Sequence, residues 1–301
     1  MKERYLTVLT IAGSDSGGCA GIQADLKTFS ALGVFGASVI TAVTAQNTQE
    51  VRAVETLSPT IIRQQAETVL DDIIIDAVKT GMLPTPEIIN TVADLIDRYN
   101  LKNVIVDPVM VATSGARLAD SDIAEAFRKH LYTRAMLITP NIPEAEALSG
   151  IIIHTEKDFQ KAADIMMEQG CQAVLIKGGH FAYDRSTDIL FGPQKGTSTV
   201  ISSNRIESKN LHGTGCTFSS AIAANIALGW DLANAVRRSK MYIFSAIKNG
   251  SQVSTGKGYG PVNHLFNPKQ LKCTSLRERS PKQSIENQQS GLLHSVRNDG
   301  K

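Results

Sequence analysis

Short runs of β-branched and apolar residues alternate with amphipathic segments along the chain as far as residue 249. Runs that are apolar at consecutive positions are typical of strands that helices cover on both faces. The pattern predicts strands over residues 6–11, 38–44, 77–80, 103–106, 136–138, 173–176, 189–191 and 199–201. Strands separated by helices favour parallel crossovers. The sequence therefore predicts an α/β fold with a central, mostly parallel sheet and helices on both of its faces.

The helices between these strands carry recognisable end signals. Gly33 follows an apolar stripe at helical spacing and is placed to cap that helix. Ser58 and Thr85 each precede a proline, as N-cap residues do before the first helical position. Asp231 is placed to cap a long final helix. These signals define where the predicted helices begin or end.

The character of the sequence changes after Pro268. Residues 269–301 are polar and lack sustained periodicity, so we expect one domain over residues 1–268 and a disordered basic tail. A partner-binding peptide around Leu292 and Leu293 is the alternative, although two leucines seldom form an interface core. The tail holds seven Lys and Arg against three Asp and Glu and so carries a net charge of +4. Because the whole chain carries +2, residues 1–268 carry −2. Such a domain offers no electrostatic basis for binding nucleic acid.

Cysteine usage and hydropathy indicate the compartment. The four cysteines lie far apart without a C-x-x-C pair, which argues against a disulfide framework or a zinc knuckle and fits a reducing compartment. The apolar run near the N-terminus is broken by Gly13 and Asp15 too early for a signal peptide. The longest uncharged apolar stretch, residues 33–45, is too short to span a bilayer as a helix. We expect a cytoplasmic protein that binds no membrane and has no dedicated metal site.

The strongest local signal is LHGTGCTFSSAIAA, residues 211–224. Gly213 and Gly215 flank Thr214 and allow a tight turn whose N–H groups converge at the start of a helix, which is a ready anion site. Cys216 falls in the first helical turn, where the macrodipole is expected to lower the thiol pKa below its usual ~8.5. The resulting thiolate would accept a proton from a substrate hydroxyl. On this pattern alone, a packed helix with Cys216 as small filler is an equal alternative.

A second signal is IAGSDSGGCAGIQAD, residues 11–25, which follows a predicted strand. Its glycines, Gly13 among them, allow the backbone to approach a flat ligand, and Asp25 supplies a hydrogen-bond acceptor. The alternative is an ordinary loop between a strand and a helix. The chain contains neither G-x-x-x-x-G-K-[ST] nor G-x-G-x-x-G, so nucleotide binding uses neither a Walker loop nor a dinucleotide fingerprint.

Further polar residues stand at the carboxyl ends of predicted strands, where parallel sheets bind ligands. Lys177 could reach a phosphate, Asp107 offers a carboxylate, and Asn141 and Glu144 could contact phosphate or a Mg²⁺-bound water. The alternatives are a surface turn for Lys177 and a helix N-cap for Asn141 and Glu144. A lone histidine such as His212 is more often structural than catalytic.

The motifs TIAGSDSGGCAGIQADLKTF, TAVTAQNTQEV, KTGML, VIVDPVM, ITPNIPEAEALSG, VLIKGGH, HGTGCTFSSAIAANIALG and GYGPVNH follow one another between residues 5 and 265. In this order and spacing they resemble the hydroxymethylpyrimidine/phosphomethylpyrimidine kinases of thiamine biosynthesis. The resemblance implies a ribokinase-like fold, Mg-ATP as co-substrate and a homodimer. It also implies two successive phosphorylations of 4-amino-5-hydroxymethyl-2-methylpyrimidine, first to the monophosphate and then to the diphosphate.

The resemblance also implies three groups of site residues. The base is Cys216, and the anion hole is formed by Gly213, Thr214 and Gly215. The pyrimidine contacts are Gly13, Asp25, Gln46 and Met82. The Mg-ATP contacts are Asp107, Asn141, Glu144 and Lys177. Many ribokinase-like enzymes carry aspartate where this chain has Cys216. Cys19 stands where the family loop usually has glycine, so a positive φ there would crowd the substrate loop.

Two alternatives share the same architecture. Pyridoxal also carries a hydroxymethyl group on a flat heteroaromatic ring, so a pyridoxal kinase is the second hypothesis. The surroundings of Gln46, Ala45-Gln46-Asn47-Thr48, favour the pyrimidine. A non-catalytic pyrimidine-binding sensor is the third hypothesis, and the intact Gly-Thr-Gly-Cys sequence argues against it.

Overall fold

The fold is built on a central sheet, seen in a computed structural model that describes residues 3–110, 122–178, 185–192 and 196–275. Within these ranges nine strands lie in the order β10-β9-β8-β7-β6-β5-β2-β3-β4. They are β2 (Thr7–Asp15), β3 (Phe35–Gln46), β4 (Val51–Thr56), β5 (Ala77–Thr80), β6 (Val104–Val106), β7 (Leu137–Ile138), β8 (Val174–Lys177), β9 (Arg185–Phe191) and β10 (Ser198–Asn204). The strands β2, β3 and β5 to β8 pair in parallel, and β4, β9 and β10 join antiparallel. The mostly parallel sheet is confirmed.

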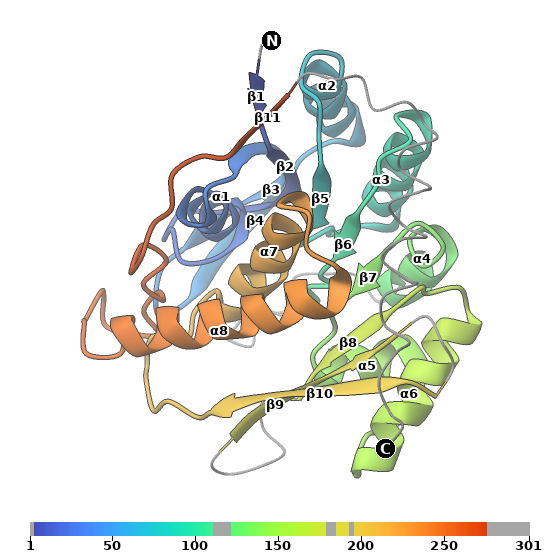
Figure 1. The fold of residues 1–301 in the computed structure, drawn as a ribbon. Coiled ribbons are helices and arrows are strands. Elements are labelled where there is room, and N and C mark those ends of the chain that lie inside the picture. The colour runs from blue at the N-terminus through green and yellow to red at the C-terminus, as the bar shows by residue number, and fades with distance from the viewer. Residues whose placement is uncertain (1–2, 111–121, 179–184, 193–195, 276–301) are drawn as a thin grey trace.

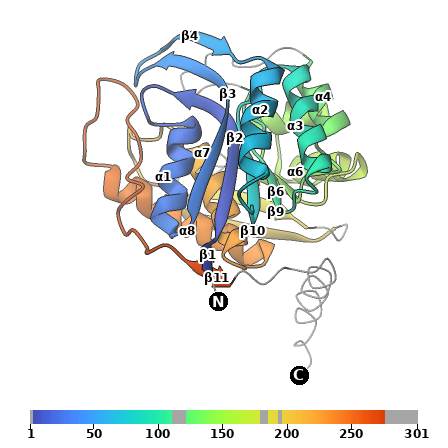
Figure 2. The ribbon, with the colours of Figure 1, turned by 90° about the horizontal axis from the view of Figure 1, so that it is seen from above.

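Helices cover both faces of the sheet (Figures 1 and 2). One layer consists of α1 (Gly21–Leu32), α7 (Thr214–Ala227) and α8 (Leu232–Gly250). The other consists of α2 (Pro59–Leu70), α3 (Pro86–Arg98), α4 (Ile123–His130), α5 (Ile142–Ser149) and α6 (Glu156–Glu168). Successive strand residues point to opposite faces, so Leu9 and Ile11 belong to the core under the second layer and Val8 to the core under the first. Both faces are therefore apolar, as predicted.

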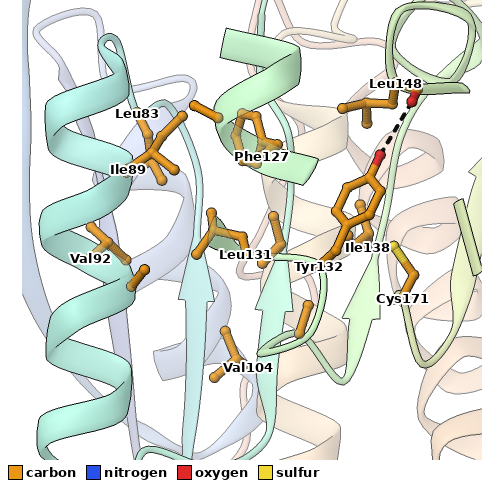
Figure 3. Close-up of a cluster of buried hydrophobic side chains, with 14 of the residues drawn as sticks. Leu83, Ile89, Val92, Val104, Phe127, Leu131, Tyr132, Ile138, Leu148 and Cys171 are labelled. Atoms are coloured by element: carbon orange, nitrogen blue, oxygen red, sulfur yellow. Dashed lines mark hydrogen bonds between the residues drawn. The ribbon is translucent and has the colours of Figure 1, made fainter. Parts of the chain in front are cut away.

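The core under the larger helix layer fixes α3 and α4 to the sheet (Figure 3). Ile89 and Val92 of α3 and Phe127 of α4 belong to one cluster of buried side chains. Tyr132 is fully buried, and its hydroxyl donates to the carbonyl of Leu148 at 3.4 Å. Each such side chain contributes about 1.5–3 kcal/mol through removal of apolar surface from water.

The predicted helix ends are confirmed. Gly33 ends α1 in the left-handed region, with φ of 79°. The side chains of Ser58, Thr85 and Asp231 accept hydrogen bonds from N–H groups in the first turns of α2, α3 and α8. All the predicted strands are present, but β4 is missing from the prediction. Its residues are almost all exposed because it pairs only with β3 among the described strands, so it carries no buried pattern.

The segment after Pro268 is partly docked onto the domain. The strand β11 (Cys273–Ser275) pairs antiparallel with the N-terminal strand β1 (Glu3–Tyr5). The Lys269 N–H also donates to the carbonyl of Ala31 at 2.9 Å. The ordered structure thus continues past the predicted domain boundary at residue 268, and residues 276–301, with the predicted disorder and the Leu292–Leu293 alternative, lie outside the described ranges. None of the described helices has the length and apolar character of a membrane span.

Candidate active site

The polar residues singled out in the sequence converge at the carboxyl ends of the parallel strands. The neighbouring strands β2 and β5 lead in opposite directions along the sheet, to β3 and to β6, which makes their carboxyl ends a switch point where such sheets bind ligands. Among the predicted residues, Met82, Asp107 and Asn141 follow β5, β6 and β7. Lys177 ends β8, and Gly13 lies near the carboxyl end of β2. The N-terminus of α7 meets this edge, since a Cβ on Gly215 would lie 3.5 Å from the ammonium of Lys177.

Gly213 can only be glycine in this arrangement. It is the N-cap of α7 with φ of 81°, and a Cβ on it would lie 1.9 Å from the carbonyl oxygen of Cys19. A side chain would therefore be strained and would also collide with backbone. The close approach presses the loop between β2 and α1 against the start of α7.

The predicted anion hole has unpaired backbone donors in the described structure, except at Thr214. The Thr214 N–H already donates to the Leu211 carbonyl at 3.3 Å. The N–H groups of Gly215 and Cys216 make no hydrogen bond to any described residue, as expected for the first turn of a helix. Gly215 and Cys216 therefore have backbone donors available to an anion, and so does Gly213, whose N–H likewise has no partner among the described residues.

Asp25 lies in a buried ion pair rather than at a ligand surface. It is fully buried on α1, and the ammonium of Lys79 donates to both carboxylate oxygens at 2.9 Å. Thr10 and Ser220 add one hydroxyl donor each, both at 2.6 Å. Each oxygen thus accepts two hydrogen bonds from the protein itself. The predicted contact of Asp25 with a pyrimidine stays a prediction, and the structure adds a structural role for this carboxylate.

Lys79 is the site residue that the sequence reasoning missed. Burial lowers its pKa, but the carboxylate of Asp25 outweighs this effect and holds the pKa above its usual value. The ammonium therefore stays charged, and a Cβ on Gly81 would come within 2.9 Å of it. The only available signal was a lysine within an otherwise buried strand, in the motif KTGML.

Asp107 and Lys177 form a second ion pair. The Lys177 ammonium donates to Asp107 Oδ1 at 2.7 Å, and Ser219 of α7 donates to Oδ2 at 3.0 Å. Burial raises the pKa of Asp107, but the ammonium groups of Lys177 and Lys79 together hold it below its usual value. The pair therefore places a fixed positive charge beside the start of α7.

Asn141 and Glu144 form a capping box at the start of α5. The Asn141 side chain accepts from the Glu144 N–H at 2.9 Å, and the Glu144 carboxylate accepts from the Asn141 N–H at 2.8 Å. Burial raises the pKa of Glu144 to about 7, although Lys177 opposes the shift. The helix-cap alternative is confirmed for both residues, and it does not exclude a contact with nucleotide.

Cys216 has a raised pKa, which contradicts the expected helix effect. Burial raises the pKa to about 11, against the opposing ammonium of Lys79. The carboxylates of Asp25 and Asp107 raise it further, and the Gly21 N–H donates to the sulfur. Desolvation and two nearby negative charges outweigh the helix terminus. At neutral pH the group is a thiol.

Gly13 and Met82, two of the predicted pyrimidine contacts, lie against each other. A Cβ on Gly13 would lie 3.5 Å from both Sδ and Cε of Met82, so the thioether lies directly against the backbone of Gly13. Gln46, at the end of β3, donates through Nε2 to Nε2 of the buried His212 at 2.8 Å. His212 is thus not an isolated structural histidine.

The loop between β2 and α1 accommodates Cys19 without strain. The residues with positive φ here are Gly18 and Gly21, and Cys19 is not among them, so its side chain does not crowd the loop as a positive φ would require. Asp15, Cys19 and His212 offer ligand atoms within 4.8 Å of one another, a group that no sequence spacing predicted. The Asp15 carboxylate, however, already accepts from three backbone N–H groups at 2.8–2.9 Å. The group is therefore better explained as loop scaffolding than as a metal site.

Comparison with known families decides the assignment. The model for phosphomethylpyrimidine kinase matches residues 15–263 of this chain. The chain belongs to this family. A hydroxymethylpyrimidine/phosphomethylpyrimidine kinase of Rhizobium meliloti is 48% identical over 258 residues, which cover 85% of this chain and 96% of the relative. A thiamine biosynthesis bifunctional protein, ThiED, of Geobacter sulfurreducens is also 48% identical, and this chain spans 52% of its length.

Solved structures give the same fold. The phosphomethylpyrimidine kinase of Clostridium difficile 630 is 47% identical, with a TM-score of 0.71 over 80% of this chain and 99% of that one. The pyridoxal kinase of Staphylococcus aureus in complex with ADP is 36% identical, with a TM-score of 0.79 over 89% and 98% of the two chains. The protein is a phosphotransferase of ribokinase-like fold that uses Mg-ATP. The ammonium of Lys177 beside the N–H groups of α7 fits the phosphates of this donor.

Proposed function

We propose that this protein phosphorylates the hydroxymethyl group of 4-amino-5-hydroxymethyl-2-methylpyrimidine and then the resulting monophosphate, as a kinase of thiamine biosynthesis. The observation that carries the proposal is the meeting of three features at one point of the sheet edge. Cys216 and the free N–H groups of α7 lie beside the ammonium of Lys177, and the charged Lys79 lies close to the thiol. A site of this kind stabilises the charge that spreads over a transferring phosphoryl group.

The chemistry follows from these positions. The substrate oxygen attacks the γ-phosphorus of ATP, the bond from that phosphorus to the bridging oxygen breaks, and ADP leaves with the bond's electron pair. The hydroxyl proton passes to the sulfur of Cys216 in the small fraction of molecules in which that group is a thiolate, and the thiol later returns the proton to solvent. Because the transition state is loose, the N–H groups of Gly215 and Cys216 contribute more than the strength of the base.

The donor side of the site is assigned to the second ion pair and its neighbours. Lys177 contacts the phosphates, Asp107 holds Lys177 in place, and Asn141 and Glu144 line the same edge. Mg²⁺ is held mainly by phosphate oxygens and water, with at most one or two protein carboxylates, and it neutralises phosphate charge. Glu144, with its pKa about 7, is the carboxylate here whose oxygens are least committed to an ammonium.

The acceptor side favours a pyrimidine. Gly13 and Met82 frame a flat ring, and the carboxamide of Gln46 supplies both a donor and an acceptor. Pyridoxal remains the second candidate, because the Staphylococcus aureus pyridoxal kinase superposes with the higher TM-score of the two structures compared. A sensor without catalysis would need neither the free helix N-terminus nor the two ammonium groups.

Product analysis tests the function. The purified protein, Mg-ATP and either the pyrimidine or pyridoxal are incubated, and the products are identified by mass spectrometry. We expect the pyrimidine mono- and diphosphate to form in succession, with a kcat/KM well above that for pyridoxal. The matched control is Cys216→Ala, which should bind the pyrimidine but turn it over slowly. A preference for pyridoxal, or binding without turnover in the wild type, would reject the proposal.

Assembly and compartment extend the proposal. We propose a homodimer through the exposed edge strand β4, where Val54 and the neighbouring Val43 and Ile61 are exposed apolar residues. Light scattering of the wild type and of Val54→Lys would show a dimer and its weakening. All four cysteines are free thiols, which supports a reducing compartment and so the cytoplasm.

A further inference from the structure

We propose that His212 sets the substrate preference of the kinase by fixing the orientation of the Gln46 carboxamide. This inference rests on the proposed function and concerns the same pocket. The residue pair is joined by a 2.8 Å contact between the two Nε2 atoms across 166 positions of sequence. His212 acts through Gln46 and is therefore a positioning residue.

The surroundings of His212 define which ring nitrogen carries the proton. Nε2 of His212 faces the amide nitrogen of Gln46, which can only donate, so the ring proton is assigned to Nδ1, the nitrogen left to interact with the backbone of Tyr259. Burial lowers the pKa of His212, so the ring is neutral and has a single N–H. Nε2 is therefore an acceptor, and Gln46 must turn its amide NH₂ toward it.

His212 is held firmly enough to impose this choice. Its side chain is 6% exposed, and its own N–H donates to the carbonyl of Gly260 at 3.1 Å. Nε2 also lies 3.9 Å from the carboxylate of Asp15, which is itself fixed by the N–H groups of its loop. A turned imidazole would lose both the 2.8 Å contact with Gln46 and the interaction of its N–H with the Tyr259 backbone.

The opposite end of the carboxamide also has a partner. The hydroxyl of Thr44 lies 3.2 Å from Gln46 Oε1 and 3.1 Å from the Ser14 carbonyl oxygen, so its one proton is shared between these two acceptors. One N–H and one oxygen lone pair of the amide then remain for a ligand. The edge of a 4-aminopyrimidine presents an amino donor next to a ring-nitrogen acceptor, which complements this pair. Pyridoxal has no amino group beside its ring nitrogen and cannot make both bonds.

A double-mutant cycle in steady-state kinetics tests the inference. The variants are His212→Leu, Gln46→Ala and the two combined, each measured with the pyrimidine and with pyridoxal. For His212→Leu we expect the KM for the pyrimidine to rise about tenfold, the cost of one misplaced hydrogen-bond pair, with kcat and the KM for ATP within about twofold. The KM for pyridoxal should change little. In the Gln46→Ala background, His212→Leu should have no further effect.

The outcomes separate this inference from the proposed function. Additive effects of the two substitutions, or equal losses for both substrates, would show that His212 only supports the fold and would overturn the inference alone. A wild type that does not phosphorylate the pyrimidine would overturn the proposed function and the inference together. If thermal melting shows that His212→Leu does not fold, His212→Gln replaces it. Its amide can turn either end toward Gln46, so the pyrimidine preference should again fall, and an unchanged preference would overturn the inference.

Discussion

The thiol of Cys216 has a pKa of about 11 because it is buried near two carboxylates. At pH 8 a group with this pKa is ionised in about one molecule in a thousand, and the fraction rises about tenfold with each pH unit. If the thiolate accepts the substrate proton, kcat must follow the same slope. Between pH 8 and 9.5 the expected rise is about thirtyfold. This window lies above the pKa of about 7 for Glu144, so the titration of that residue does not contribute.

The matched variant for this prediction is Cys216→Asp. A carboxylate is already ionised throughout the window, since its ordinary pKa is ~3.9. Its kcat profile should therefore be flat where the wild-type profile rises. The assay is coupled detection of ADP at saturating Mg-ATP and pyrimidine, with the coupling enzymes in excess at every pH. A flat wild-type profile, or the same slope in Cys216→Asp, would refute the assignment of the thiolate as base and leave the N–H groups of α7 as the main source of catalysis.

Three further predictions concern buried groups. Lys79→Met should lower the free energy of unfolding by about 3–5 kcal/mol in urea titrations, since it leaves the fully buried Asp25 charge unpaired, and adding Asp25→Asn should recover much of the loss. Gly213→Ala should lower kcat by at least about tenfold, because a Cβ there strains the backbone and displaces the Cys19 carbonyl from the start of α7; unchanged kinetics would contradict the contact. Glu144 has a pKa raised to about 7, so the free energy of unfolding falls as pH rises from about 4.5 to 7 and the buried carboxylate ionises. Glu144→Gln removes this charge and should therefore raise the free energy of unfolding by up to about 3 kcal/mol at pH 8, but not at pH 4. An equal gain at both pH values would contradict the raised pKa.

The sheet could be predicted from the sequence because its strands are buried on both faces and read as continuous apolar runs. β4 could not, since an edge strand with exposed side chains has no such run. Helix ends at Ser58 and Thr85 were predictable because a cap depends on residues within one turn. The docking of β11 on β1 joins the two ends of the domain, and no local pattern signals it.

The site residues divide in the same way. Gly213 follows from local backbone geometry, and its positive φ bears this out. The ion pair of Asp25 could not be predicted from local sequence, because its partners Lys79 and Ser220 are 54 and 195 positions away. A lysine within a strand can belong to either face or to an edge until the fold is known. The position of Lys79 in a buried strand therefore did not indicate that it pairs with Asp25.

Cys216 shows why local reasoning gave the wrong sign for a pKa. The sequence near Cys216 indicated one electrostatic effect, the partial positive charge at the N-terminus of the predicted helix, and this effect predicts stabilisation of a thiolate. The fold adds burial and the carboxylates of Asp25 and Asp107, all of which stabilise the neutral thiol, and the ammonium of Lys79 is the largest effect that opposes them. Lys79 therefore has two separable functions, to neutralise Asp25 and to limit how far the thiol pKa rises. Replacing Lys79 and Asp25 together by neutral residues removes the first requirement but also removes the ammonium that most opposes the rise of the thiol pKa. The double variant should thus regain stability more completely than activity.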